Sequence, residues 1–325
     1  MIRAHTHQAR RRRRMLTAGL TSLAAALSLV LSACGTNSTN TLGGNTGGAI
    51  PTSTVTCPTN AANWHLVQSS TLTVASDTTY APAEYPDPTN ATHFIGYDMD
   101  LIREVARRMC LQPNIVKATF DDIIPSITTG SLGQQRYDLS ISSFTINDQR
   151  LKKVNMIPYL TAGESILVPK GNPKHITKFE DMCGKTIAVQ NGTVELDELK
   201  DANGTGTNAS SQAPVCKTAG KPITIVSNDD QGLVVQQVLN GRADATYQDE
   251  PVTIYYVFLN KNKLENGPRT VAPSPQGIVV RKDNKPLEDA ITAALCSIQK
   301  DGTYKRILES WQASGEAFQT PNCPA

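Results

Sequence analysis

The sequence predicts an α/β fold of two similar lobes, each a mainly parallel sheet flanked by helices. Short apolar strands alternate with amphipathic helices from residue 72 to residue 247. A helix, a glycine turn and an aspartate leading into a strand follow one another twice, around Gly130 and again around Gly241. Repeated strand–helix–strand units form parallel sheets covered by helices, and their ligands bind outside the carboxyl ends of the strands. A cleft between the lobes is therefore the expected ligand site.

The first cycle begins with a short apolar strand. The helix that follows places its apolar residues at helical spacing, with charged residues on the other face. A second helix ends at Gly130, where glycine adopts a left-handed cap at little cost. We expect strands at 72–75, 115–118 and 137–143, and helices at 97–109 and 121–129.

The second cycle repeats this order and is followed by a return to the first lobe. We expect strands at 186–189, 223–226 and 243–247, and helices at 194–200 and 232–239. After a loop at 266–276, a strand at 277–280 and helices at 287–300 and 303–314 close the chain. A strand and two helices after a complete second cycle indicate that the chain crosses between the lobes twice, which requires a hinge.

The N-terminus has the features of a signal peptide. A run of arginines at 10–14 precedes an apolar stretch at 15–31 that is short for a membrane span. The stretch ends in Leu-Ser-Ala-Cys at 31–34, which resembles the bacterial lipobox and predicts lipidation of Cys34. An ordinary secretory signal before an unmodified cysteine is the alternative. We divide the chain into a signal peptide (1–33), a lipidated Cys34 with a flexible linker (34–65), lobe 1 (66–163 plus 275–325) and lobe 2 (164–274).

The net charge of +2 belongs to the signal peptide, because residues 1–33 contain six arginines and no acids. The remaining chain has 25 basic and 29 acidic residues, which gives no reason to expect a nucleic-acid partner. Six cysteines remain after Cys34, an even number that predicts three disulfides in an exported chain. Fifteen pairings are possible. We favour the pairs that lie within one stretch of the chain: Cys57 with Cys110, Cys183 with Cys216, and Cys296 with Cys323.

Catalytic and cofactor motifs are absent from the sequence. It contains no HExxH, GxSxG, Walker or dinucleotide-binding motif, and no cysteine–histidine spacing that suggests a metal, so we expect no catalytic residues, cofactor or metal. The acidic pairs at 121–122 and 229–230 stand where helices begin, and helix capping explains them.

Binding chemistry is better represented. The stretch SISSFTINDQR at 140–150 brings several hydroxyls to a strand end and finishes on Arg150, a side chain that binds carboxylates with two parallel hydrogen bonds. Asp249 follows the matching strand of the second cycle and suits an ammonium group. One cation and one anion on opposite lobes would suit a zwitterion, although two ordinary surface charges are an equally good interpretation.

Taken together, the motifs resemble the polar amino-acid-binding proteins of ABC transporters, solute-binding protein family 3. The resemblance runs from about residue 72 to residue 312. It rests on VASDTTYAP at 74–82, GYDMDL at 96–101, the stretch 120–130, YDLSISSFTINDQR at 137–150, GT at 192–193, GRAD at 241–244, QDE at 248–250 and DGTY at 301–304. It implies the type II periplasmic-binding-protein-like fold, in which two hinge crossovers join two lobes that close on an L-amino acid.

The resemblance also implies roles for single residues. Arg150 would bind the α-carboxylate with backbone N–H groups of Thr145 and Thr193. Asp249 would bind the α-ammonium group with the Ser143 carbonyl and the Thr145 hydroxyl. The remaining implied contacts are a pocket floor of Ser142 and Ser143, an apolar wall at Phe120, and Asp77 and Tyr80 facing the ligand side chain.

Asp77 at the distal end favours a cationic or polar ligand, such as lysine, arginine, histidine, ornithine or glutamine, over glutamate. A structural role for Asp77 in capping the turn at 78–79 remains open. The expected protein is a monomeric receptor, lipid-anchored on the outer face of the cytoplasmic membrane, whose partners are a free L-amino acid and the permease and ATPase subunits of an ABC importer. The alternatives are an enzyme similar to cyclohexadienyl dehydratase on the same scaffold, or a sensory binding protein.

Overall fold

The computed structural model describes residues 57–58, 61–207, 213–321 and 323, which all belong to the unit Ile50–Ala325. The predicted signal peptide and Cys34 lie outside the described residues. The helices are α1 (Tyr97–Arg108), α2 (Phe120–Thr128), α3 (Asp148–Lys153), α4 (Val194–Ala202), α5 (Val215–Thr218), α6 (Gln231–Leu239), α7 (Glu250–Leu259), α8 (Lys285–Lys300) and α9 (Thr303–Ser310), with 3₁₀ turns at Ala61–Trp64, Phe179–Met182 and Ser314–Glu316. No helix in this part of the chain is long and apolar enough to cross a membrane.

The strands form one large mixed sheet and one small hairpin. They are β1 (Thr71–Ser76), β2 (Tyr85–Asp87), β3 (Asn90–Ile95), β4 (Gln112–Lys117), β5 (Leu139–Ser140), β6 (Val154–Pro169), β7 (Thr186–Gln190), β8 (Thr224–Asn228), β9 (Ala245–Asp249) and β10 (Leu264–Arg281). The large sheet has the order β4-β1-β5-β10-β6-β9-β7-β8, and β2 pairs with β3. In each half the outer strands are parallel, as β4-β1-β5 and as β9-β7-β8.

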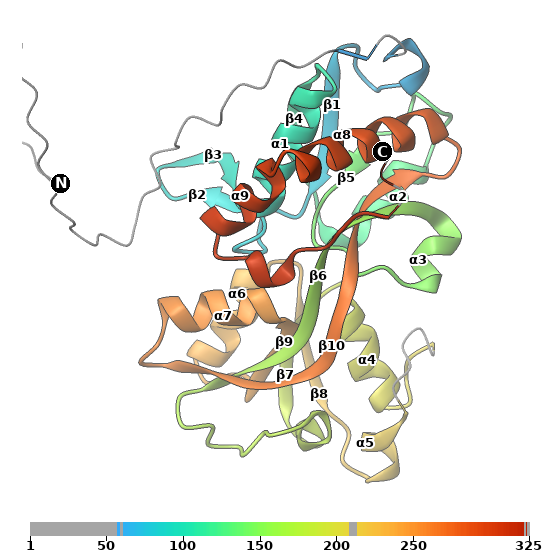
Figure 1. The fold of residues 1–325 in the computed structure, drawn as a ribbon. Helices are drawn as coiled ribbons and strands as arrows, with labels where there is room; N and C mark the ends of the chain where they lie inside the picture. The colour runs from blue at the N-terminus through green and yellow to red at the C-terminus, as the bar shows by residue number, and fades with distance from the viewer. Residues whose placement is uncertain (1–56, 59–60, 208–212, 322, 324–325) are drawn as a thin grey trace, which may run out of the picture. The chain divides into compact units, whose positions relative to one another are not determined.

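Helices cover both faces of each half of the sheet. Successive residues of a strand point to opposite faces, so neighbouring residues pack against different helices. In β1, Val74 packs with α1, α8 and α9, while Ala75 packs with α2. In β7, Ile187 packs with α4, while Ala188 packs with α6. The chain therefore forms the two-lobe α/β architecture that the alternating pattern predicts (Figure 1).

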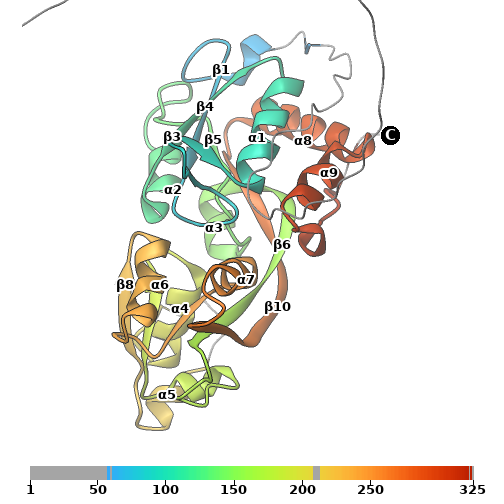
Figure 2. The ribbon, with the colours of Figure 1, turned by 90° about the vertical axis from the view of Figure 1, so that its left-hand side faces the viewer.

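The last strand and two helices return to the first lobe, as predicted. Residues from β10, α8 and α9 share one core with residues of β1 and α1. The connection between the lobes consists of β6 and β10, which run side by side as an antiparallel pair from Leu264 opposite Pro169 to Arg281 opposite Val154 (Figure 2). These are the two crossovers of the expected hinge. The exact lobe boundaries stay a prediction.

Three elements differ from the sequence expectations. The predicted loop at 266–276 is part of β10, which stays extended because it pairs with β6 through several register shifts. The predicted strand at 137–143 is only β5, since Ser143 adopts a left-handed φ of 48° that takes the chain out of the sheet. The last helix ends at Ser310 rather than at 314, because Gln312 has a φ of 57°. We also did not predict β2, β3, β6, α3, α5 or α7.

The three predicted disulfides are confirmed. Cys57 binds Cys110, Cys183 binds Cys216 and Cys296 binds Cys323, with Cα–Cα distances of 5.6, 5.0 and 5.3 Å. Two of the cross-links fasten the ends of the described chain, and the third connects α5 to the 3₁₀ turn before β7.

Candidate functional site

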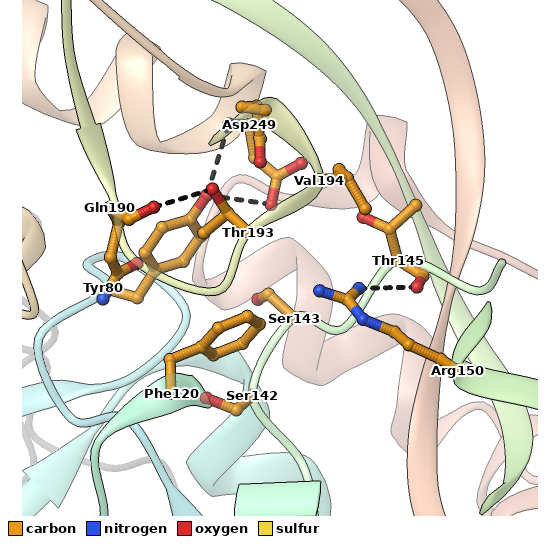
Figure 3. A pocket seen from close by; sticks show the side chains of 11 residues that line it. Tyr80, Phe120, Ser142, Ser143, Thr145, Arg150, Gln190, Thr193, Val194 and Asp249 are labelled. Atoms are coloured by element: carbon orange, nitrogen blue, oxygen red, sulfur yellow. Dashed lines mark hydrogen bonds between the residues drawn. The ribbon is translucent and has the colours of Figure 1, made fainter. Parts of the chain in front are cut away.

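A small pocket lies where the carboxyl ends of β7 and β9 meet the segments that follow β1 and β5 (Figure 3). The free space between its side chains, part of it open to solvent, is about 250 Å³. Eight of the nine predicted ligand-binding residues line it: Tyr80, Phe120, Ser142, Ser143, Thr145, Arg150, Thr193 and Asp249. Three further residues, Gln190, Val194 and Glu195, were not predicted.

Arg150 is held by its own short helix and by two aromatic rings. The Asn147 side chain caps α3 by accepting a hydrogen bond from the Arg150 N–H at 2.9 Å. The guanidinium carbon lies 5.5 Å from the centroid of Phe120 and 5.0 Å from that of Phe144, and these rings stack at 4.2 Å. Arginine binds well to such flat faces because its charge is delocalised and weakly hydrated. The stacking fixes the plane in which the guanidinium can donate.

The guanidinium has carbonyl partners but no carboxylate. It donates to the Thr145 carbonyl at 2.7 Å and, from the other lobe, to the Gly192 carbonyl at 3.2 Å. Among the described residues no acid forms an ion pair with Arg150. Burial lowers the pKa of Arg150, and the negative charges of Glu195, Asp197 and Asp249 oppose this shift. A partly desolvated guanidinium without a counter-ion is a strong site for an anionic group.

Asp249 stands across the pocket at the end of β9, with 5% of its surface exposed. Its Oδ2 accepts a hydrogen bond from the Tyr80 hydroxyl at 3.0 Å, and the Tyr80 oxygen accepts one from the Asp249 N–H at 3.2 Å (Figure 3). The Gln276 amide also donates to Oδ2 at 2.9 Å. Burial and the neighbouring charge of Glu164 raise the pKa of Asp249 to about 7. Both side-chain donors are neutral, so this carboxylate also lacks a counter-ion.

The serines at the pocket floor are fixed from behind by buried acids. Asp98 accepts a hydrogen bond from the Ser143 N–H at 3.0 Å, and the Tyr159 hydroxyl donates to the same carboxylate. The Ser142 hydroxyl donates to Glu84 at 2.8 Å. These bonds hold the strained backbone at Ser143 in place, as is common where a site needs a special geometry.

The N-terminus of α4 closes the pocket from the second lobe. Thr193 caps this helix by accepting from the Leu196 N–H at 3.2 Å, so the helix directs its positive end toward the pocket. Gly192 before it has a φ of +76°, and a Cβ here would lie 2.6 Å from the Asp121 Cβ in the first lobe. Glycine therefore permits both the turn and the close approach of the two lobes.

Asp77 lies beside the pocket rather than in its lining. Its carboxylate accepts hydrogen bonds from the Gln190 amide and, at 3.0 Å, from the Thr79 hydroxyl. The local turn-capping role left open by the sequence is thus present, while its contact with a ligand side chain stays a prediction. Burial raises the pKa of Asp77 to about 7.

The residues that sequence reasoning missed belong to the β7–α4 connection. Gln190 ends β7, while Val194 and Glu195 begin α4. The signal was available, because the connection after a parallel strand lies at the ligand-binding edge of the sheet. Thr193 is the one residue of this connection that the sequence analysis predicts in the site. Glu195 is not predicted, because an acid in the first turn of a helix is normally explained by the helix dipole.

Several hydrogen bonds join the two lobes around the pocket. The Tyr80–Asp249, Gln190–Asp77 and Arg150–Gly192 contacts are described above, and the Gln231 N–H donates to the Thr79 hydroxyl at 3.1 Å. The lobes are therefore in contact across the cleft. Within the described ranges no group of three or more potential ligands could hold a metal ion.

A two-lobe α/β fold with an arginine and an aspartate facing one small interlobe pocket defines a solute-binding protein. Residues 72–314 match the bacterial extracellular solute-binding proteins, family 3, and the chain belongs to this family. The match confirms the resemblance that the motifs indicate.

Relatives that are named for a ligand match about three quarters of the chain. The chain is 29% identical over 248 residues to the arginine-binding protein ArgT of Corynebacterium glutamicum, covering 76% of this chain and 75% of that protein. It is 28% identical over 265 residues to the lysine/arginine/ornithine-binding periplasmic protein of Escherichia coli, covering 77% and 91%. A solved structure of an ancestral arginine-binding protein bound to arginine is 32% identical, with a TM-score of 0.65 and coverage of 74% and 98%.

Proposed function

We propose that this protein is the amino-acid receptor of an ABC importer and that it closes on an L-amino acid with a cationic or polar side chain. The observation that carries the proposal is a pair of charged side chains that face one pocket, half-buried Arg150 in one lobe and buried Asp249 in the other, with no ion-pair partner for either among the described residues. An amino-acid zwitterion supplies both missing charges. The relatives named for arginine, lysine and ornithine favour a basic side chain, with histidine and glutamine as further candidates.

The carboxylate end of the ligand would bind at Arg150. Phe120 and Phe144 cover the flat face of the guanidinium, so the N–H groups at its edge that do not bond the Thr145 and Gly192 carbonyls would donate two parallel hydrogen bonds. The N-terminus of α4 behind Thr193 adds backbone N–H donors from the opposite lobe. Because these donors come from different lobes, the carboxylate binds best when the lobes are together.

The ammonium end would bind at Asp249. The neutral Tyr80 hydroxyl donates to this carboxylate. A cation beside a carboxylate lowers the carboxylate pKa and favours its ionised form. The Asp249 carboxyl, whose pKa burial has raised to about 7, would then carry a full negative charge in the complex.

Ligand binding would favour the closed arrangement, because the ligand contacts both lobes only when they are together. A ligand shifts a conformational equilibrium only as far as it binds one state better than the other. The closed form is the one that the permease and ATPase subunits of the importer would recognise. We further propose that the receptor is a monomer, is exported and is held on the outer face of the cytoplasmic membrane by lipid on Cys34.

An enzyme on the same scaffold is the alternative. The acid that the sequence offered for a dehydratase, Asp77, is bonded to Gln190 and Thr79 and does not line the pocket. We therefore propose binding without turnover. Mass spectrometry of amino acids and of a cyclic dehydratase substrate after incubation with the protein tests this, and a new product would contradict it.

A thermal-shift screen with the twenty amino acids and ornithine tests the proposed function. A ligand that binds only the folded state raises the melting temperature by an amount set by its affinity. We expect stabilisation by arginine, lysine or ornithine, or by histidine or glutamine. Stabilisation by glutamate alone would contradict the proposed ligand class, and no response to any amino acid would contradict the function.

A further inference from the structure

Glu195 is an acid in the pocket that the clamp for a zwitterion does not use. It lies in the first turn of α4, lines the pocket with Arg150 and Asp249, and is 3% exposed. Its Oε1 has no hydrogen-bond partner in the described part of the chain. A buried oxygen without a partner costs free energy, so an occupant that donates a hydrogen bond at this position would stabilise the site.

The surroundings of Glu195 are mostly negative. The titratable and charged groups that face it are Tyr80, Arg150 in α3, Glu164 in β6, Glu198 in its own helix and Asp249 at the end of β9. Glu164 and Glu198 are themselves buried and share the Tyr247 hydroxyl as a donor. Burial, followed by the charges of Asp249 and Glu164, raises the pKa of Glu195 far above its ordinary value. This shift favours the protonated form of the Glu195 carboxyl.

Building on the proposed function, we propose that Glu195 recognises the positively charged side chain of the ligand, and that it releases a proton to solvent when such a ligand binds. A basic amino acid carries one negative and two positive groups. Arg150 pairs with the carboxylate and Asp249 with the α-ammonium group, so the side-chain cation needs a second acid. Asp77 is already bonded to Gln190 and does not line the pocket, whereas Glu195 lines it with an unpaired oxygen.

The proton balance distinguishes classes of ligand. When a cation approaches Glu195, the carboxyl O–H bond breaks, the proton passes to water, and the carboxylate that remains pairs with the cation. The net charge buried at this end of the pocket is then zero. A neutral side chain such as that of glutamine hydrogen-bonds the protonated carboxyl and displaces no proton. Basic amino acids should therefore release one proton more than neutral ones, in addition to any proton that Asp249 releases to every amino acid.

Calorimetry of the whole exported chain tests this coupling. Titrations with L-lysine, L-arginine and L-glutamine in buffers of different ionisation enthalpy give the number of protons released per ligand. We expect about one proton more for lysine or arginine than for glutamine, and a ratio of lysine to glutamine affinity that rises with pH by up to about tenfold per unit. Lysine or arginine binding that releases no more protons than glutamine binding would overturn the inference while leaving the proposed function standing.

Two variants with the same chemical change assign the proton to one residue. Glu195→Gln should abolish the extra proton release and reduce the ratio of lysine to glutamine affinity by about tenfold or more, because one charge-assisted hydrogen bond is lost. Glu309→Gln, at an exposed acid in α9 outside the pocket lining, should keep both. Extra proton release that persists in Glu195→Gln would overturn the assignment. Failure of every amino acid to bind the wild-type chain would overturn the proposed function, and this inference with it.

Discussion

Replacing Arg150 by methionine should weaken amino-acid binding strongly without destabilising the protein. Methionine keeps the apolar stem that lies over Phe120 and Phe144 but removes the guanidinium. A bidentate arginine–carboxylate contact consists of two charge-assisted hydrogen bonds, each contributing about 1.5 to 3 kcal/mol. The two together, about 3 to 6 kcal/mol, correspond to a loss of affinity of about a hundredfold to about twenty-thousandfold.

The stability of the ligand-free protein should respond in the opposite sense. The guanidinium has no carboxylate partner among the described residues, so burying it in the closed cleft costs free energy that methionine avoids. Removing its bonds to the Thr145 and Gly192 carbonyls offsets part of the gain. We expect the free energy of unfolding of Arg150→Met to be equal to or above that of the wild type.

Calorimetry for affinity and urea denaturation without ligand measure the two effects. Arg136→Met is the matched control, because Arg136 also lies over an aromatic ring, 5.1 Å from the centroid of Tyr137, but outside the pocket. Its affinity should equal that of the wild type. Unchanged affinity in Arg150→Met would refute the assignment of Arg150 to the ligand carboxylate. A loss of more than about 2 kcal/mol in the free energy of unfolding would refute the inference that the unpaired guanidinium does not stabilise the ligand-free protein.

Three further changes probe closure, pH and cross-linking. Gly192→Ala should weaken ligand binding, measured by calorimetry, because its Cβ would lie 2.6 Å from that of Asp121 when the lobes meet; a full-affinity variant would contradict the closed geometry. The pKa of Asp77 rises from 3.8 to about 7 on folding, so the folded state binds the extra proton and stability falls as pH rises through this window. Asp77→Asn should flatten this fall in urea denaturation, and an unchanged pH profile would contradict the shift. Replacing Cys183 and Cys216 by serine should lower the free energy of unfolding by about 3 to 4 kcal/mol, since the disulfide closes a loop of 33 residues; equal stability would contradict the cross-link.

Elements with a strong local signal could be predicted, and elements defined by distant pairing could not. The helix beginning at Tyr97 was placed to within one residue because its apolar stripe is set by its own sequence. The segment 266–276 contains one glycine and three prolines, which locally favour a loop. It nevertheless remains a strand, since pairing with β6 at the sheet centre overrides local preference and the register shifts accommodate the interruptions.

The same distinction applies to the site. Arg150 and Asp249 could be paired from the sequence because each follows the end of a strand in one of two repeated cycles. The Asp77–Gln190 contact could not be predicted from the sequence, because it joins residues 113 positions apart across the cleft and depends on how the lobes meet. Glu195 escaped notice for a different reason. An acid in the first turn of a helix is locally explained by the helix dipole. The burial of Glu195 beside Asp249, which only the structure shows, indicates a role in ligand binding.

The selectivity expected of the pocket is set by charge rather than by shape. Asp249 and Asp77 are both satisfied by neutral donors, Tyr80 and Gln190, and burial raises the pKa of each to about 7. Hydrogen bonds are therefore already present without a ligand, and what the site lacks is positive charge. A basic amino acid provides it, whereas glutamate would add a further negative charge to a desolvated acidic environment. Because Coulomb interactions are stronger there than in water, exclusion of glutamate needs no steric barrier.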